Sequence, residues 1–161
     1  LNPRTTLKGS RLTPRIAEQL PDHEFQIAGE FASEEDAKRV AELDNVEHIG
    51  WVNDMSEVYR KASLVLVPSL VEEGGGPRVV IEGFANGVPA VGTNRGAVPE
   101  HIGDAGRIVS DPYDFGEWAR LIEDALANRT KLSERARQNA TKYQVDKRID
   151  EFETVLQRVI N

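Results

Sequence analysis

Short apolar runs alternate along the chain with segments whose apolar residues are spaced as on one face of a helix. The apolar runs predict strands at residues 23–28, 45–51, 63–68, 88–93 and 107–109. The third run, Ser-Leu-Val-Leu-Val-Pro, is apolar without alternation, which is typical of a strand covered on both faces of a parallel sheet. The patterns between the strands predict helices at residues 13–20, 34–43, 54–61, 77–86, 99–102 and 111–128, followed by two more at 131–143 and 145–160.

Residues with known preferences for helix ends support several of these boundaries. Thr13 is predicted as an N-cap, with Pro14 at the first helical position, where a missing N–H costs nothing. Ser33 is predicted to cap the next helix, whose acidic first turn matches the helix dipole. Gly87 is predicted to end the helix at 77–86.

The order of these elements indicates the fold class. Strands that alternate with helices indicate an α/β protein with a doubly wound, Rossmann-like parallel sheet and helices on both faces. The two final helices are predicted to form an appended layer. Because the chain has 161 residues and no internal repeat or interdomain linker, residues 1–161 are predicted to be a single domain.

Composition and charge exclude several classes of function. The chain has 27 acidic and 20 basic residues, and this net charge of −7 argues against a general nucleic-acid or anionic-membrane binder, since both need a basic face. The absence of cysteine excludes a disulfide scaffold, a thiolate zinc site and a cysteine nucleophile, and three scattered histidines argue against a His-rich metal site. No apolar run approaches the roughly 20 residues that span a bilayer, and no signal peptide is visible. Because the first residue is Leu1 rather than Met, we expect the chain to be a fragment of a longer protein. We expect that protein to be located in the cytoplasm or at the inner face of the membrane.

The glycine-rich segment after the third predicted strand carries the strongest sign of chemistry. Glu72 and Glu73 precede three successive glycines, and a helix is predicted to begin at about Pro77. Beyond the carboxyl end of a strand in an open α/β sheet, a helix N-terminus offers N–H groups and a partial positive charge to a phosphate. Glu82, a turn and a half into that helix, is an acceptor-only group that could bind two vicinal ribose hydroxyls. By spacing alone, a flexible turn with solvated glutamates is an equal alternative.

The run EEGGGPRVVIEGFANGVPAVGT, at residues 72–93, resembles the signature of retaining glycosyltransferase family 4, whose enzymes have the two-domain GT-B fold. Other parts of the chain are collinear with that family: Lys8-Gly9, Ala28-Gly29-Glu30, the segments 46–52 and 58–69, and Gly96-Ala97-Val98-Pro99-Glu100. The resemblance covers residues 1 to 127 and implies that the chain is the C-terminal, donor-binding half of such an enzyme.

The glycine run departs from the family pattern at one point. The family has seven residues between its two glutamates, whereas eight residues separate Glu73 from Glu82, and glycine replaces the family's aromatic residue. We interpret this as a one-residue insertion that leaves Glu73 as the first acid, with Glu72 in reserve.

The resemblance implies a role for each matching residue. Among the implied catalytic residues, Glu73 touches hydroxyls of the donor sugar beneath the charge that develops at the anomeric carbon, while Lys8, partnered by Arg4, neutralises the leaving diphosphate. Glu82 is implied to hold the ribose hydroxyls. The residues implied to approach the diphosphate are Gly75, Gly76, Arg78 and Val79, and those implied to line the base pocket are Gly50, Trp51 and Val52, together with Ile49 and Met55.

Each of these roles has a simpler alternative. Lys8 could be a solvated surface lysine and Trp51 a core residue, while Met55 could fill a gap between helix and sheet. His48 and His101 are interpreted as ordinary surface or partly buried histidines.

The implied reaction is the transfer of a hexose from a nucleotide diphosphate sugar to an acceptor hydroxyl, with retention at the anomeric carbon and with no metal or other cofactor. The acceptor, a glycan, a lipid or a small molecule, would bind to an N-terminal domain that this chain lacks. The chain alone is therefore expected to bind nucleotide weakly and to be inactive. Two other functions stay open: half of a nucleotide-sugar 2-epimerase, and a non-catalytic nucleotide-binding or interaction domain.

Overall fold

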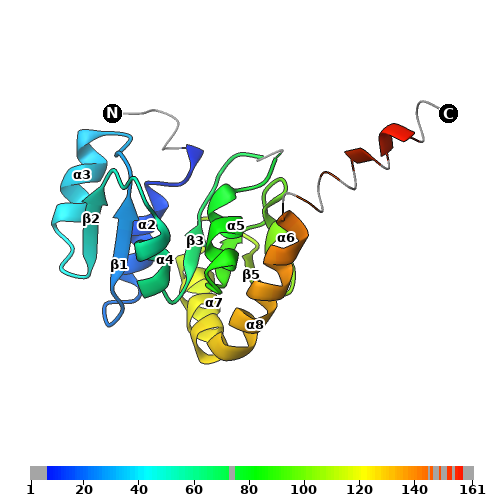
Figure 1. Cartoon of the computed structure of the whole chain (residues 1–161). Coiled ribbons are helices and arrows are strands. Elements are labelled where there is room, and N and C mark those ends of the chain that lie inside the picture. Colours follow the sequence, from blue (N-terminus) through cyan, green and yellow to red (C-terminus); the bar gives the residue numbers. More distant parts are fainter. Residues whose placement is uncertain are drawn as a thin grey trace.

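The computed structural model describes residues 7–72 and 75–144, together with residues 146, 149, 152–153 and 155–157. The elements follow the alternating order that the sequence predicts (Figure 1). The first half contains α2 (Leu12–Glu18), β1 (Phe25–Ala28), α3 (Glu34–Ala41), β2 (Val46–Gly50) and α4 (Ser56–Lys61). The second half contains β3 (Val65–Val67), α5 (Arg78–Ala85), β4 (Ala90–Thr93), α6 (Val98–Ile102), β5 (Gly106–Val109), α7 (Phe115–Ala127), α8 (Arg129–Ala140) and the 3-10 turn η1 (Thr141–Tyr143). All five predicted strands are present, and four of them are shorter than predicted.

Two helix boundaries test the capping predictions. The prediction for Ser33 is confirmed, because its hydroxyl accepts a hydrogen bond from the Asp36 N–H at 3.1 Å. The prediction of Thr13 as an N-cap is wrong, because the N-cap is Arg11 and α2 begins at Leu12, two residues before Pro14. A turn in which the Leu12 N–H donates to the Gly9 carbonyl at 2.9 Å starts the helix before Thr13 is reached.

The strands are parallel, as predicted, but they form two sheets rather than one. β1 pairs with β2, while β3, β4 and β5 pair in that order. Within the described residues, no strand pairing joins β1 to β3. The order β2-β1 followed by β3-β4-β5 corresponds to the 3-2-1-4-5-6 order of a Rossmann sheet in which none of the described strands occupies the central position. Residues of both β1 and β3 line a cavity, which is described below.

Helices cover both faces of the three-stranded sheet. α7 packs against β4 and β5, while α5 packs against β3 and α6 against β4. Val91 of β4 belongs to the apolar cluster under α7, and its neighbour Ala90 belongs to the cluster under α5, α6 and α8. Successive side chains of a strand point to opposite faces, so this alternation places the helices in two layers.

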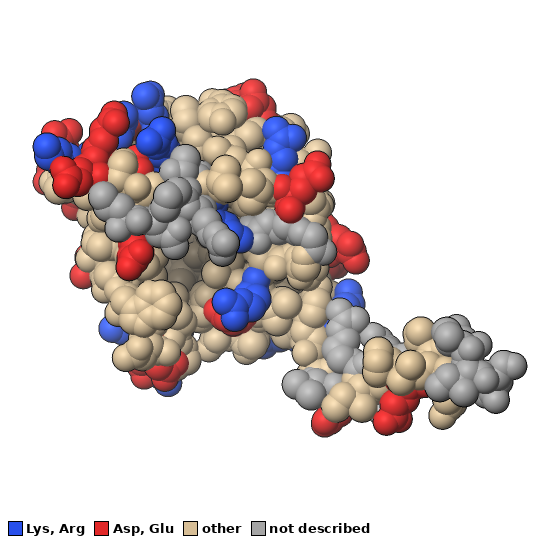
Figure 2. Space-filling model, turned by 90° about the horizontal axis from the view of Figure 1, so that it is seen from above, with Lys and Arg blue, Asp and Glu red and all other residues tan. Residues whose placement is uncertain are grey.

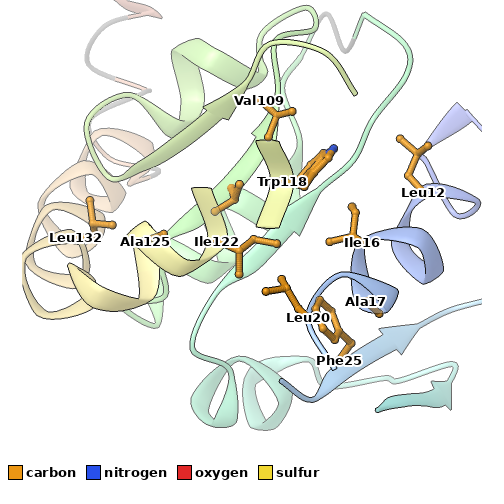
Figure 3. Close-up of a cluster of buried hydrophobic side chains, with 11 residues drawn as sticks. Leu12, Ile16, Ala17, Leu20, Phe25, Val109, Trp118, Ile122, Ala125 and Leu132 are labelled. Atoms are coloured by element: carbon orange, nitrogen blue, oxygen red, sulfur yellow. The ribbon is translucent and has the colours of Figure 1, made fainter. Parts of the chain in front are cut away.

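The apolar cluster under α7 joins the two halves of the chain. Ile16 of α2 and Leu20, which lies just after that helix, point toward Trp118 and Ile122 of α7 (Figure 3). Trp118 is fully buried, and its indole N–H donates to the Pro112 carbonyl at 3.1 Å. This packing carries α2, and the turn before it, to a fixed place beside the three-stranded sheet.

The C-terminal helices partly match the prediction. The helix predicted at 131–143 is α8 followed by η1, beginning two residues earlier than predicted. Much of the segment predicted as a helix at 145–160 lies outside the described residues, and those that are described within it are helical. Within the described ranges, we find no helix with the length and apolar character required to cross a membrane.

Candidate functional site

A cavity of about 1000 Å³ lies between the two sheets. Its walls include residues of β1, β3 and α4, and at the carboxyl ends of the strands they include Lys8, Ser69 and the first turn and a half of α5. Figure 2 looks onto this end of the molecule and shows a surface hollowed near its middle, with Lys or Arg side chains beside the hollow. We call this upper part of the cavity the mouth, and define it by Lys8, Pro77, Arg78, Val79 and Glu82.

The N-terminus of α5 forms one side of the mouth. Pro77 is the N-cap, with an extended backbone, and α5 begins at Arg78. Because the helical ladder starts four residues later, the N–H groups of Arg78 and Val79 have no acceptor within the helix. Val80 is different, since its N–H donates to the Pro77 carbonyl at 3.0 Å. The first turn of α5 therefore offers two backbone donors and a partial positive charge to the mouth.

Glu82 lies one helical turn after Arg78 on the same side of α5. Its Oε2 accepts a hydrogen bond of 2.8 Å from the hydroxyl of Tyr59, which comes from α4. Tyr59 is 5% exposed, and burial raises the pKa of its phenol, with the hydrogen bond to Glu82 and the charge of that carboxylate acting in the same direction. The phenol is therefore a permanent donor to a carboxylate that faces the mouth.

The turn at Lys8 and Gly9 forms another part of the wall of the mouth. Gly9 has φ +81°, and a Cβ at this position would collide with the carbonyl of Pro68, just beyond β3. A hydrogen bond of 2.8 Å from the Leu70 N–H to the Leu7 carbonyl holds the same turn against the end of β3. Only glycine can approach so closely in this conformation, and the approach brings Lys8 into the same cavity as Glu82.

The glycine loop before α5 is held by a histidine from α6. Gly76 has φ +74°, and a Cβ there would collide with the imidazole ring of His101. His101 contacts the Ala97 carbonyl through Nδ1 at 3.0 Å, and its ring stacks on Tyr143 with centroids 5.3 Å apart. His101 is interpreted from the sequence as an ordinary histidine, and no motif in the sequence could have placed it against this loop.

Of the residues predicted to line the base pocket, Met55 lines the cavity and Gly50, Trp51 and Val52 do not. Gly50 ends β2. Trp51 is 80% exposed, so its interpretation as a core residue is wrong. Its indole N–H donates to Asn53 Oδ1 at 3.1 Å, and its role beside a base stays a prediction.

Two of the predicted catalytic residues, Arg4 and Glu73, lie outside the described residues. Glu72, the reserve for Glu73, is described and exposed. Among the described residues, no group of three or more histidines, aspartates and glutamates is arranged to hold a metal ion. The structure thus brings Lys8, Arg78, Val79 and Glu82 together, with Gly76 directly before them.

Substitution of Gly76 by alanine tests whether the loop needs its left-handed residue. We expect Gly76→Ala to lower the free energy of unfolding by about 1–2 kcal/mol from backbone strain alone, with a further loss from the collision with His101. Urea denaturation followed by circular dichroism measures the change. The matched control is Gly75→Ala, where a Cβ would meet open space and φ is not positive, so a change within about 0.5 kcal/mol is expected. Equal effects at both positions would contradict this account of the loop.

Comparison with known proteins finds a matching family and a shared fold. A family model for glycosyl transferases group 1 matches residues 10–143. The D-inositol 3-phosphate glycosyltransferase of Mycobacterium sp. (strain KMS) is 32% identical over 143 residues, which is 81% of this chain and 32% of that protein. The N-acetyl-alpha-D-glucosaminyl L-malate synthase of Bacillus anthracis is 31% identical over 123 residues, covering 73% of this chain and 32% of that protein. The chain spans about a third of the length of these two relatives.

Solved structures share the fold at lower identity. A glycosyltransferase from Rickettsia africae superposes with a TM-score of 0.83 at 17% identity, over 96% of this chain and 45% of that one. Sucrose-phosphate synthase from Thermosynechococcus elongatus has a TM-score of 0.77 at 21% identity, over 96% of this chain and 43% of that one. Anabaena HepE in complex with UDP has a TM-score of 0.77 at 19% identity, over 93% of this chain and 46% of that one. In fold, the chain therefore corresponds to just under half of each of these structures.

Proposed function

Because the chain belongs to the group 1 glycosyl transferases, we propose that it is the donor-binding domain of a retaining hexosyltransferase and that it binds a nucleotide diphosphate sugar at the mouth. The observation that carries the proposal is the meeting of Lys8, the first turn of α5 and Glu82 in one cavity at the carboxyl ends of the strands. Ligands of open α/β sheets bind at this end.

The diphosphate is assigned to the positive side of the mouth. The N–H groups of Arg78 and Val79 point out of the first turn of α5, where the helix dipole favours an anion. Lys8, which lines the same cavity, adds a full positive charge. When the bond from the anomeric carbon to the diphosphate oxygen breaks, these groups would stabilise the charge that collects on the leaving diphosphate.

The ribose is assigned to Glu82. A carboxylate is the acceptor that two neighbouring hydroxyls require, and Glu82 is one helical turn from the amides assigned to the diphosphate. This spacing supports a nucleoside diphosphate as the part of the donor that the domain holds.

The proposal includes the rest of the predicted reaction. The hexose would pass to an acceptor hydroxyl with retention at the anomeric carbon, with Glu73 beneath that carbon, and with no metal or other cofactor besides the donor. The acceptor, a glycan, a lipid or a small molecule, would bind to a further domain of the intact protein. We therefore expect the 161-residue chain to bind the donor nucleotide without catalysing transfer.

Calorimetric titration of the chain with UDP and with GDP tests the proposal. We expect one of the two diphosphates to bind in the high micromolar to millimolar range, while the matching nucleoside, uridine or guanosine, binds at least tenfold more weakly because it cannot reach Lys8 and the α5 amides. Failure of both diphosphates to bind at millimolar concentration would show that the mouth is not a donor site.

A further inference from the structure

We propose that Tyr59 is a positioning residue for the donor: its hydroxyl holds one oxygen of the Glu82 carboxylate so that the other oxygen faces the pentose hydroxyls. The inference rests on the proposed function, since it assigns a second residue to the ribose end of the same site. No role for Tyr59 is predicted from the sequence.

The two side chains come from different helices and meet at the cavity wall. Tyr59 lies in α4 and Glu82 in α5, 23 residues apart, and both line the cavity. The Tyr59 hydroxyl is 2.8 Å from Glu82 Oε2, within the normal range for a hydrogen bond to an ionised oxygen. Among the described residues, Oε1 of Glu82 has no side-chain partner. One oxygen is therefore held while the other is open to the mouth.

Tyr59 can hold Glu82 because it is itself held. Its ring belongs to the buried cluster that contains Val65, Val80 and Phe84. Its backbone is tied into α4 by a hydrogen bond of 3.0 Å from its own N–H to the Met55 carbonyl. A ring packed within a buried cluster has little freedom to move its hydroxyl, whereas a solvated side chain has much more.

Glu82 needs such a partner because it is exposed. A glutamate on a helix surface samples many rotamers, and ordering it when a ligand binds costs conformational entropy. A carboxylate that is already held in its binding orientation avoids most of that loss. Burial and the neighbouring carboxylate both raise the pKa of the Tyr59 phenol, so the hydroxyl keeps its proton and remains a donor.

The test compares Tyr59→Phe with Tyr113→Phe, which removes the same hydroxyl from a tyrosine that is 62% exposed. Each protein is titrated with whichever of UDP and GDP binds the wild type, and with its 2′,3′-dideoxy analogue, by calorimetry or by ligand-detected nuclear magnetic resonance for weak binding. We expect Tyr59→Phe to weaken binding of the diphosphate about tenfold and to leave binding of the dideoxy analogue unchanged. Tyr113→Phe should change neither affinity.

For each protein, the decisive quantity is the ratio of its affinity for the diphosphate to its affinity for the dideoxy analogue. A partly unfolded variant binds both nucleotides less well by the same factor, so the ratio reports the ribose hydroxyls even if Tyr59→Phe lowers stability. A ratio equal to that of the wild type would overturn the assignment of Tyr59, whatever the absolute affinities. Absence of binding to the wild type would instead remove the proposed function, and the role of Tyr59 with it.

A second readout uses the Glu82→Ala background. If Tyr59 acts through Glu82, adding Tyr59→Phe to Glu82→Ala should weaken the diphosphate no further. An additional tenfold loss in the double variant would show that Tyr59 contacts the ligand by another route and would contradict a positioning role.

Discussion

Replacement of Glu82 by alanine should weaken binding of the nucleoside diphosphate by about 100-fold. Two hydrogen bonds from ribose hydroxyls to a carboxylate are lost, and each such charge-assisted bond contributes about 1.5–3 kcal/mol. The two bonds together would contribute about 3–6 kcal/mol. Because contributions at one carboxylate are not additive, we take the lower end of this range, which corresponds to a loss of about 100-fold. Calorimetric titration of the wild-type and variant chains with the diphosphate measures the change.

The control for this experiment is Glu57→Ala. Glu57 lies in α4, its side chain is 67% exposed, and it pairs with Arg60 rather than facing the cavity. Its removal lowers the negative charge by the same amount as Glu82→Ala, so an affinity equal to that of the wild type separates a specific contact from a general change of charge. Loss of the Glu82 carboxylate without loss of affinity would place the ribose elsewhere and would contradict the proposed site.

Replacement of Trp118 by alanine should lower the free energy of unfolding by about 3–5 kcal/mol. Trp118 is fully buried in the cluster that joins α2 to α7, and alanine would leave a large cavity there and an unpaired Pro112 carbonyl. Because small domains are stable by only about 5–15 kcal/mol, a large part of the margin would be lost. Urea denaturation followed by far-ultraviolet circular dichroism measures the change.

The other tryptophan of the chain is the matched control. Trp51 is 80% exposed, so Trp51→Ala should change the free energy of unfolding by no more than about 0.5 kcal/mol. Both variants remove the same side chain, and only the burial differs. Similar losses at both positions would show that the α2–α7 cluster does not hold the two halves together.

The strands and helices, and the presence of a site after β3, could be predicted from the sequence because they depend on local patterns. A continuous apolar run such as residues 63–68 suits a doubly covered strand in any context, and it forms β3. Ser33 caps its helix through a contact with a residue three positions away. Lys8 and Glu82, assigned by motif resemblance, line one cavity.

Contacts between distant segments could not be predicted in the same way. The sequence contains no sign that Tyr59 meets Glu82, because the two helices that carry them are brought together by burial of the cluster around Val80 and Phe84. The contact of His101 with Gly76 likewise depends on how α6 packs beside α5. Trp51 is a case in which the sequence allowed a contact that the fold does not make. Its apolar character is compatible with a core position, but the side chain is exposed.

The sequence by itself determined the alternation of strands and helices and the parallel arrangement, since these follow from local patterns along the chain. Only the tertiary structure decided that β1 and β3 stand apart around a cavity and that a buried phenol holds the carboxylate at its mouth. The physical reason is that packing free energy is summed over the whole chain. It sets distances between residues that no local pattern relates.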